Sequence, residues 1–128
     1  MRLLLDTHAF LWYVLDDPKL SAAAKTAIND PDTDILVSPA SYWEIAIKIS
    51  INKYLLSVPY EEFWRHGIGD NDFDVLPIDI AHTGALLTLP FHHKDPFDRL
   101  LVAQAIVEKI PLVSADAVLD AYPIIRVW

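Results

Sequence analysis

The chain has 128 residues, the size of one domain with its own hydrophobic core, so we expect a single domain over residues 1–128. A hydrophobic content of 53%, with 11% aromatic residues, excludes a disordered chain. The net charge of -8 excludes a protein that grips nucleic acid by a basic surface alone. No apolar run approaches the roughly 20 residues that cross a bilayer. Cysteine is absent, which fits a reducing compartment, and we expect a cytoplasmic protein with no membrane partner.

Short apolar runs alternate with helical segments along the chain. Runs of strand length predict five strands, at residues 2–5, 34–37, 75–78, 111–114 and 124–127. The intervening patterns and start signals predict helices at about 7–15, 21–29, 39–51, 60–68, 80–89, from 96, and a short one near 117–121. Strands of consecutive apolar residues separated by helices indicate a mainly parallel sheet with both faces covered.

Residues 89–105, which read L-P-F-H-H-K-D-P-F-D-R-L-L-V-A-Q-A, carry the strongest local signal. Asp95 followed by Pro96 predicts a helix start, because Asp accepts from free N–H groups at the N-cap and Pro at the first position has no N–H to leave unpaired. Asp98 then lies in the first turn of a helix that is apolar on most of its surface and therefore buried. Two interpretations of Asp98 remain open, a capping-box partner or a carboxylate that faces a cleft.

Three further acids lie where a parallel sheet usually binds ligands, beyond the carboxyl ends of its strands. Asp6 follows the first predicted strand, Asp116 follows the fourth, and Glu44 lies early in the helix after the second. Asp98 joins them only if the start of its helix bends over the same edge, which is an assumption about topology. Each acid also has a structural interpretation, since Asp6 and Asp116 suit helix caps and Glu44 suits a pair with Lys48.

Carboxylates that converge in one cleft repel each other unless a cation lies between them. Oxygen ligands without cysteine select a hard ion such as Mg²⁺ or Mn²⁺, which normally shares its coordination shell with substrate phosphate. Such an ion lowers the pKa of an attacking water and neutralises charge in phosphodiester hydrolysis. The acids therefore predict a metal-dependent enzyme that acts on phosphodiesters.

Four segments together resemble the PIN-domain nucleases, specifically the VapC-like toxins of type II toxin–antitoxin pairs: L-L-L-D-T, S-Y-W-E-I-A, D-P-F-D-R-L-L-V-A-Q-A and L-V-S-A-D. The match runs in order over essentially the whole chain. It implies a three-layer α/β/α sandwich, Mg²⁺- or Mn²⁺-dependent cleavage of single-stranded RNA, and inhibition by a cognate antitoxin. It also places Asp6, Glu44 and Asp98 in the family's acidic triad, Asp116 at a more variable fourth position and Ser114 where a hydroxyl orders the site.

Five other residues have both a functional and a structural interpretation. Thr7 either orients the preceding carboxylate or belongs only to the helix cap. His92 and His93 either meet phosphate and tune the site or are merely solvated. Arg99 either binds a phosphate or an antitoxin carboxylate or pairs with a neighbouring acid. Asp95 is first an N-cap, with metal binding through water as the alternative.

The predicted helix over residues 7–15 is apolar all round, so we expect a partner to cover part of it, either a second copy in a homodimer or an antitoxin segment. Three other classes of protein are alternatives. A haloacid-dehalogenase-like phosphatase would carry a second Asp where His8 stands, and a receiver-type domain would need a strand that ends in Asp with a downstream Lys. A catalytically silent PIN scaffold that only binds partners is disfavoured by the intact acids.

Overall fold

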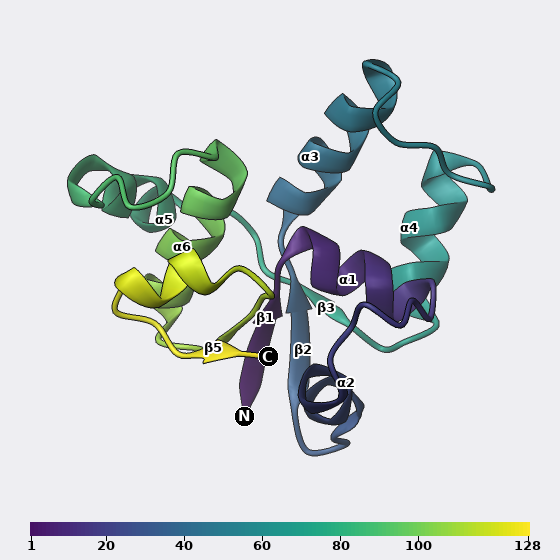
Figure 1. Cartoon of the computed structure of the whole chain (residues 1–128), viewed down its shortest axis with the longest axis horizontal. Coiled ribbons are helices and arrows are strands. Elements are labelled where there is room, and N and C mark those ends of the chain that lie inside the picture. Colours follow the sequence, from purple (N-terminus) through teal and green to yellow (C-terminus); the bar gives the residue numbers. More distant parts are fainter.

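A five-stranded, fully parallel sheet forms the middle of the molecule (Figure 1). The computed structural model describes residues 1–128, with strands β1 (Arg2–Leu5), β2 (Asp34–Val37), β3 (Asp74–Val75), β4 (Leu112–Val113) and β5 (Arg126–Val127). Their spatial order is β3-β2-β1-β4-β5, so the chain reverses its direction of travel across the sheet between β1 and β4. Ligand sites of open parallel sheets lie beside such a reversal, at the carboxyl ends of the strands.

Helices cover both faces of the sheet, which confirms the predicted three-layer arrangement. They are α1 (Thr7–Val14), α2 (Ala22–Asn29), α3 (Pro39–Ser50), α4 (Tyr60–Gly69), α5 (Ile80–Ala85) and α6 (Pro96–Glu108), with 3₁₀ turns η1 (Leu86–Thr88) and η2 (Ala117–Ala121). In Figure 1, α1, α2 and α4 lie on one side of the sheet and α5 and α6 on the other. Side chains of β1 alternate between the two cores: Leu3 and Leu5 pack with Phe10 of α1, whereas Leu4 packs with Leu101 of α6.

Four predicted elements are shorter in the structure than predicted. The predicted strand at 75–78 is Asp74–Val75, because the Leu76 N–H still donates to the Val37 carbonyl (2.9 Å) but Pro77 has no N–H with which to continue the ladder. The predicted helix at 80–89 ends at Ala85 and continues only as η1. The last two strands are two residues long and shorter than predicted.

The chain itself covers much of the apolar surface of α1, while Trp12, Tyr13 and Val14 stay partly exposed, so a partner on this helix stays a prediction. Phe10 is fully buried and stacks on Trp64 of α4, with ring centroids 4.9 Å apart. Trp12 packs beside Trp128 at the C-terminus. Leu15, directly after the helix, is 50% exposed. None of the helices has the length and apolar character needed to cross a membrane.

Candidate active site

Asp6 stands directly after β1, next to the end of β4. Its Oδ1 accepts the Ala9 N–H (2.7 Å) and so caps α1. Desolvation by burial raises the pKa of Asp6, while hydrogen bonds from the Ser114 side chain and from Ala9 act in the opposite direction. The predicted cap is therefore present, but it occupies one oxygen of a buried carboxylate. Ser114 follows β4, and its Oγ also accepts the Asp116 N–H (3.1 Å); that it orders the site stays a prediction.

Glu44 is buried on α3 and reaches the same region. Its Oε2 accepts from Lys48 Nζ (2.8 Å), which confirms the predicted pair at this spacing. Its Oε1 is buried and has no hydrogen-bond partner. A buried carboxylate oxygen without a partner is destabilising, and a cation or a hydrogen-bond donor would satisfy it. The buried contact between Thr7 Oγ1 and Ser41 Oγ (2.9 Å) ties α1 to α3 and so fixes this helix beside Asp6.

Asp98 lies at the start of α6, where Asp95 is the N-cap, as predicted. Asp95 Oδ1 accepts the N–H groups of Phe97 (2.8 Å) and Asp98 (3.2 Å). Burial, followed by the charges of Asp95, Asp6 and Glu44, raises the pKa of Asp98 to about 7. Those charges act on Asp98 because the start of α6 lies over the same edge of the sheet, which confirms the topological assumption made from the sequence.

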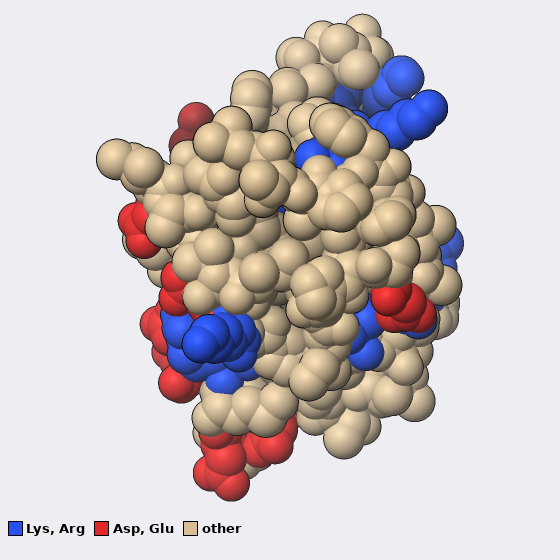
Figure 2. Space-filling view, turned by 90° about the vertical axis from the view of Figure 1, so that its left-hand side faces the viewer, with Lys and Arg blue, Asp and Glu red and all other residues tan.

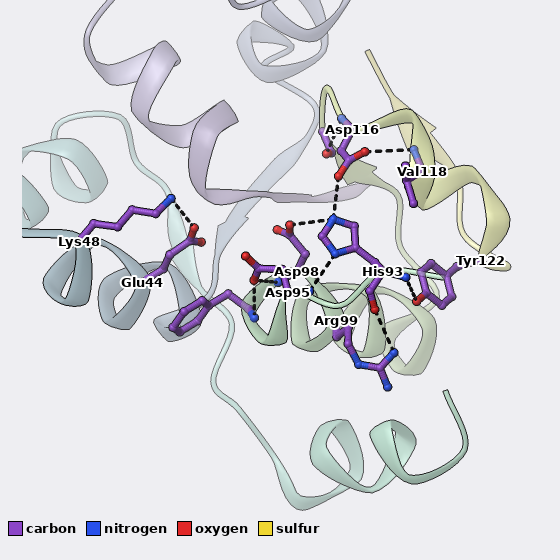
Figure 3. Close-up of polar contacts among 11 residues, drawn as sticks. Glu44, Lys48, His93, Asp95, Asp98, Arg99, Asp116, Val118 and Tyr122 are labelled. Atoms are coloured by element: carbon purple, nitrogen blue, oxygen red, sulfur yellow. Dashed lines mark hydrogen bonds and ion pairs between the residues drawn. The ribbon is translucent and has the colours of Figure 1, made fainter. Parts of the chain in front are cut away.

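Asp116 follows β4 and caps η2, with its Oδ1 accepting the Val118 N–H (3.0 Å). Its Oδ2 is 2.8 Å from His93 Nε2, and the same nitrogen is 3.3 Å from Asp98 Oδ2 (Figure 3). His93 therefore belongs to the site, and the interpretation that it is merely solvated is wrong. His92 does not take part, because it is exposed and its ring lies against Tyr122 at a centroid distance of 5.1 Å.

Arg99 is buried and faces away from the acids, so its predicted roles are not the observed one. Its guanidinium donates to the backbone carbonyls of Leu89 (3.1 Å), Pro90 (2.8 Å) and His93 (3.4 Å), as Figure 3 shows for the last of these. It contacts no carboxylate and holds the loop before α6 in place. Among the four acids, only Glu44 forms an ion pair with a lysine or arginine.

The donor set fits a hard divalent cation. The Asp6 carboxylate before α1, that of Glu44 on α3 and that of Asp98 on α6 lie near one another, and one Glu44 oxygen has no partner. Burial first, and then the neighbouring negative charges, raise the pKa of Asp98. Ligand atoms of Asp98, Asp116 and His93 lie within 4.8 Å of one another, and carboxylate oxygens of this kind suit Mg²⁺ or Mn²⁺.

Sequence reasoning missed two residues that support the site. Ser41 lies three residues before Glu44, so helical spacing alone would have placed it on the same face. The Tyr122 hydroxyl accepts the His93 N–H (3.0 Å) and donates to the Pro90 carbonyl (2.7 Å). No local pattern announces that contact, because Tyr122 and the loop before α6 are far apart in the sequence.

Residues 3–125 match the PIN domain family. The sequence is also similar to Ribonuclease VapC22 of Mycobacterium tuberculosis, with 31% identity over 114 residues that cover 88% of this chain and 85% of that protein. The chain therefore belongs to the PIN domain family, as the motif resemblance indicated, and the phosphatase and receiver alternatives are set aside.

Two solved structures share the fold over nearly the whole chain. VapBC2 from Rickettsia felis, bound to a DNA fragment from its promoter, superposes with a TM-score of 0.74 at 14% identity, covering 98% of this chain and 97% of that one. FitAcB from Neisseria gonorrhoeae gives a TM-score of 0.65 at 14% identity, covering 97% and 95%. At this level of identity the likeness establishes the fold, and the chemistry is argued from the residues.

Proposed function

We propose that this protein is the toxin of a toxin–antitoxin pair, a metal-dependent endoribonuclease that hydrolyses single-stranded RNA or RNA loops. The observation that carries the proposal is the buried Glu44 Oε1 without a partner, beside an Asp98 whose pKa is raised to about 7. Membership of the PIN domain family and the similarity to Ribonuclease VapC22 support the same activity. RNA of the cell is the substrate, so the enzyme would act in the cytoplasm.

Asp6, Glu44 and Asp98 would hold Mg²⁺ or Mn²⁺, with Asp116 at the edge of the set. When bound, such an ion lowers the pKa of a water and neutralises charge on the phosphate in the transition state. The chain's own contribution is to fix the ligands before the ion arrives. Asp6 is held by its cap to Ala9, and the Ser114 side chain hydrogen-bonds to the same carboxylate.

RNA binding would depend on the metal, because the protein offers the phosphates little positive charge. The net charge is -8. Figure 2 shows the face beside α5 and α6, where Lys and Arg side chains form separate groups and no continuous basic track. An unpaired strand suits a site of this size better than a duplex, since its phosphates and bases can be drawn individually toward the acids.

The partner would be an antitoxin, as the complexes of similar fold suggest. An apolar groove of about 480 Å³ lies between the end of α1, the segment over residues 54–58 and α4, and Val14, Leu15 and Phe63 line it. Leu55 and Val58, which also line the groove, are exposed apolar side chains, and Trp43 and Ile51 are exposed apolar side chains outside it. Surfaces of this kind are rare on isolated domains, so we retain the homodimer as part of the proposal.

The test is to incubate the purified chain with single-stranded RNA in Mn²⁺, in Mg²⁺ and in EDTA. We expect cleavage with either ion and none after chelation, and cleavage should return when Mg²⁺ is added back. Asp98→Asn protein prepared in parallel controls for contaminating nuclease. Cleavage that survives exhaustive chelation would refute the metal dependence, and retained antitoxin binding with no cleavage would favour the binding module.

A further inference from the structure

His93 lies between two acids of the site and the first turn of α6. Its Nδ1 is 3.1 Å from the backbone nitrogen of Asp95. Its Nε2 is 2.8 Å from Asp116 Oδ2 and 3.3 Å from Asp98 Oδ2. The side chain is only 17% exposed, and both ring nitrogens have partners within the protein.

The contact with Asp95 decides which ring nitrogen carries the proton. A backbone N–H donates only to an unprotonated ring nitrogen, so Nδ1 is the acceptor and Nε2 carries the hydrogen. His93 Nε2 therefore donates toward Asp116 and Asp98. A nitrogen that carries a proton does not ligate a metal, so His93 is not a ligand even though it lies within reach of the same ion as the two acids.

The same contact changes what Asp98 is free to do. In a capping box, the side chain three residues after the N-cap accepts the N–H of the N-cap residue. Asp95 is the N-cap of α6 and Asp98 is the third residue of the helix, but here His93 Nδ1 accepts the Asp95 N–H instead. The Asp98 carboxylate is thereby released from the cap and lies near Asp6 and Glu44, whose charges act on it.

We propose that His93 is a positioning residue of the metal site: it accepts the Asp95 N–H in place of Asp98, and its Nε2–H holds the Asp98 and Asp116 carboxylates toward the cation. The inference rests on the proposed metal-dependent function but concerns binding of the ion and not cleavage. Without His93, the Asp95 N–H has no acceptor, and Asp98 turns back to fill the ordinary capping-box position. Metal affinity then falls because one ligand is engaged elsewhere.

Calorimetric titration with Mg²⁺ and with Co²⁺ tests this role in four proteins: the wild type, His93→Ala, His93→Asn and His92→Ala. We expect His93→Ala to weaken both ions alike, by about 10-fold or more, the range for residues that orient metal ligands. His93→Asn keeps an acceptor for the Asp95 N–H and should recover most of the loss. His92→Ala is the matched control and should bind as the wild type does, since His92 lies against Tyr122 and contacts none of the acids.

Two results in the titrations would overturn the proposal. A loss for Co²⁺ that far exceeds the loss for Mg²⁺ would make His93 a direct ligand, because imidazole favours transition metals. Unchanged affinity for both ions would show that His93 does not contribute to metal binding. Nitrogen-15 NMR of the metal-free protein should show the proton of His93 on Nε2, and a proton on Nδ1 would equally overturn it. Protein that binds metal in the expected pattern but cuts no RNA would refute the proposed activity and leave this inference standing.

Discussion

Two histidines in this protein make the same pair of hydrogen bonds in opposite electrostatic settings. His82 Nδ1 accepts the N–H of Asp79, the N-cap of α5, and its Nε2 is 2.8 Å from Glu108 Oε2. His93 makes the equivalent bonds to the N-cap of α6 and to Asp116. At His82, Arg2 also donates to Glu108 (3.3 Å), and the hydrogen bond from His82 is the main cause that lowers the pKa of Glu108. His82 and Arg2 together favour the ionised form of Glu108.

The cluster of His93, Asp98 and Asp116 has no such balance of positive and negative charge. Neither Asp98 nor Asp116 pairs with a lysine or arginine, and the pKa of Asp98 is raised instead of lowered. A histidine accepts the N-cap N–H at both helix starts, but His82 is the third residue of α5 whereas His93 precedes the N-cap of α6. The start of α5 ends in a balanced ion pair, and the start of α6 keeps an excess of negative charge. An excess of partly buried negative charge suits a site for a divalent cation, whereas a balanced cluster contributes to stability.

The largest expected effect comes from removing the acid at the centre of the unbalanced cluster. Asp98→Asn should reduce RNA cleavage in Mn²⁺ by more than about 100-fold, beyond the range of residues that only orient ligands, because an amide cannot supply the charge that holds the ion. In EDTA the same variant should melt at the same temperature or higher, since one of several repelling carboxylates is gone. A variant that melts markedly lower and still cuts RNA would return Asp98 to a capping role.

In the balanced cluster of His82, Asp79 and Glu108, the histidine should matter for stability and not for metal binding. His82 is fully buried, so His82→Ala should lower the free energy of unfolding by about 3 kcal/mol, through a cavity and the lost partners of Asp79 and Glu108. Metal affinity should not change. Denaturant unfolding and Mg²⁺ titration measure both quantities. His66→Ala is the matched control: this exposed histidine forms a surface pair with Asp70, whose loss is worth little.

If His82→Ala lowered metal affinity as much as His93→Ala, the distinction between the two clusters would be lost. A stability change no larger than that of His66→Ala would show that burial of His82 contributes nothing beyond a surface pair. Either result would contradict the claim that the His82 cluster contributes to stability and the His93 cluster to metal binding.

The sequence predicted the elements better than it predicted the contacts between them. The strands and the start of α6 followed from apolar runs and from the Asp95–Pro96 signal, which act within a few residues. For Asp6 and Asp116, capping a helix and facing the site do not exclude each other. Each carboxylate has two oxygens, and in both residues one oxygen caps a helix while the other remains for the site.

Longer-range features were out of reach of the sequence. His93 and Asp116 are 23 residues apart, and only the fold brings the histidine into contact with the acids. Neither the ligand-binding role nor the acid pair predicted for Arg99 is observed, because its guanidinium binds backbone carbonyl oxygens that no local pattern identifies. The apolar character of α1 is legible in the sequence, but its packing against α4 and the C-terminus is not identified by any local pattern.

The two clusters should also respond to pH with opposite sign. The folded-state pKa of Asp98 is raised from 3.8 to about 7, so the metal-free protein should lose stability as pH rises through this interval, by on the order of 2 kcal/mol between pH 5 and pH 8. The raised pKa of Asp6 acts in the same direction. Glu108 acts oppositely, because its pKa is lowered from 4.5 and its contribution is lost only as pH falls below that value.

Chemical unfolding in EDTA across this pH range measures the effect, and Asp98→Asn is the control that assigns it. The decline between pH 5 and pH 8 should flatten in that variant, and Mg²⁺ should restore stability at pH 8 in the wild type, since the ion neutralises the repelling carboxylates. An Asp98→Asn profile parallel to that of the wild type would place the origin of the decline elsewhere.

The smallest expected effect separates the two roles of Asp95, a cap by geometry and a source of charge beside Asp98. Asp95→Ala removes the acceptor for the Phe97 and Asp98 N–H groups and should cost about 0.5 to 2 kcal/mol of stability while leaving some cleavage. Removing the charge also relieves repulsion once Asp98 is ionised, so the loss should be smaller at pH 8 than at pH 5 in EDTA. Asp95→Asn keeps the capping oxygen without the charge, so it should show little loss at pH 5 and a gain at pH 8. Equal losses for Ala and Asn would mean that the charge of Asp95, and not its cap, stabilises the start of α6, and the excess of negative charge at this site would then need another explanation.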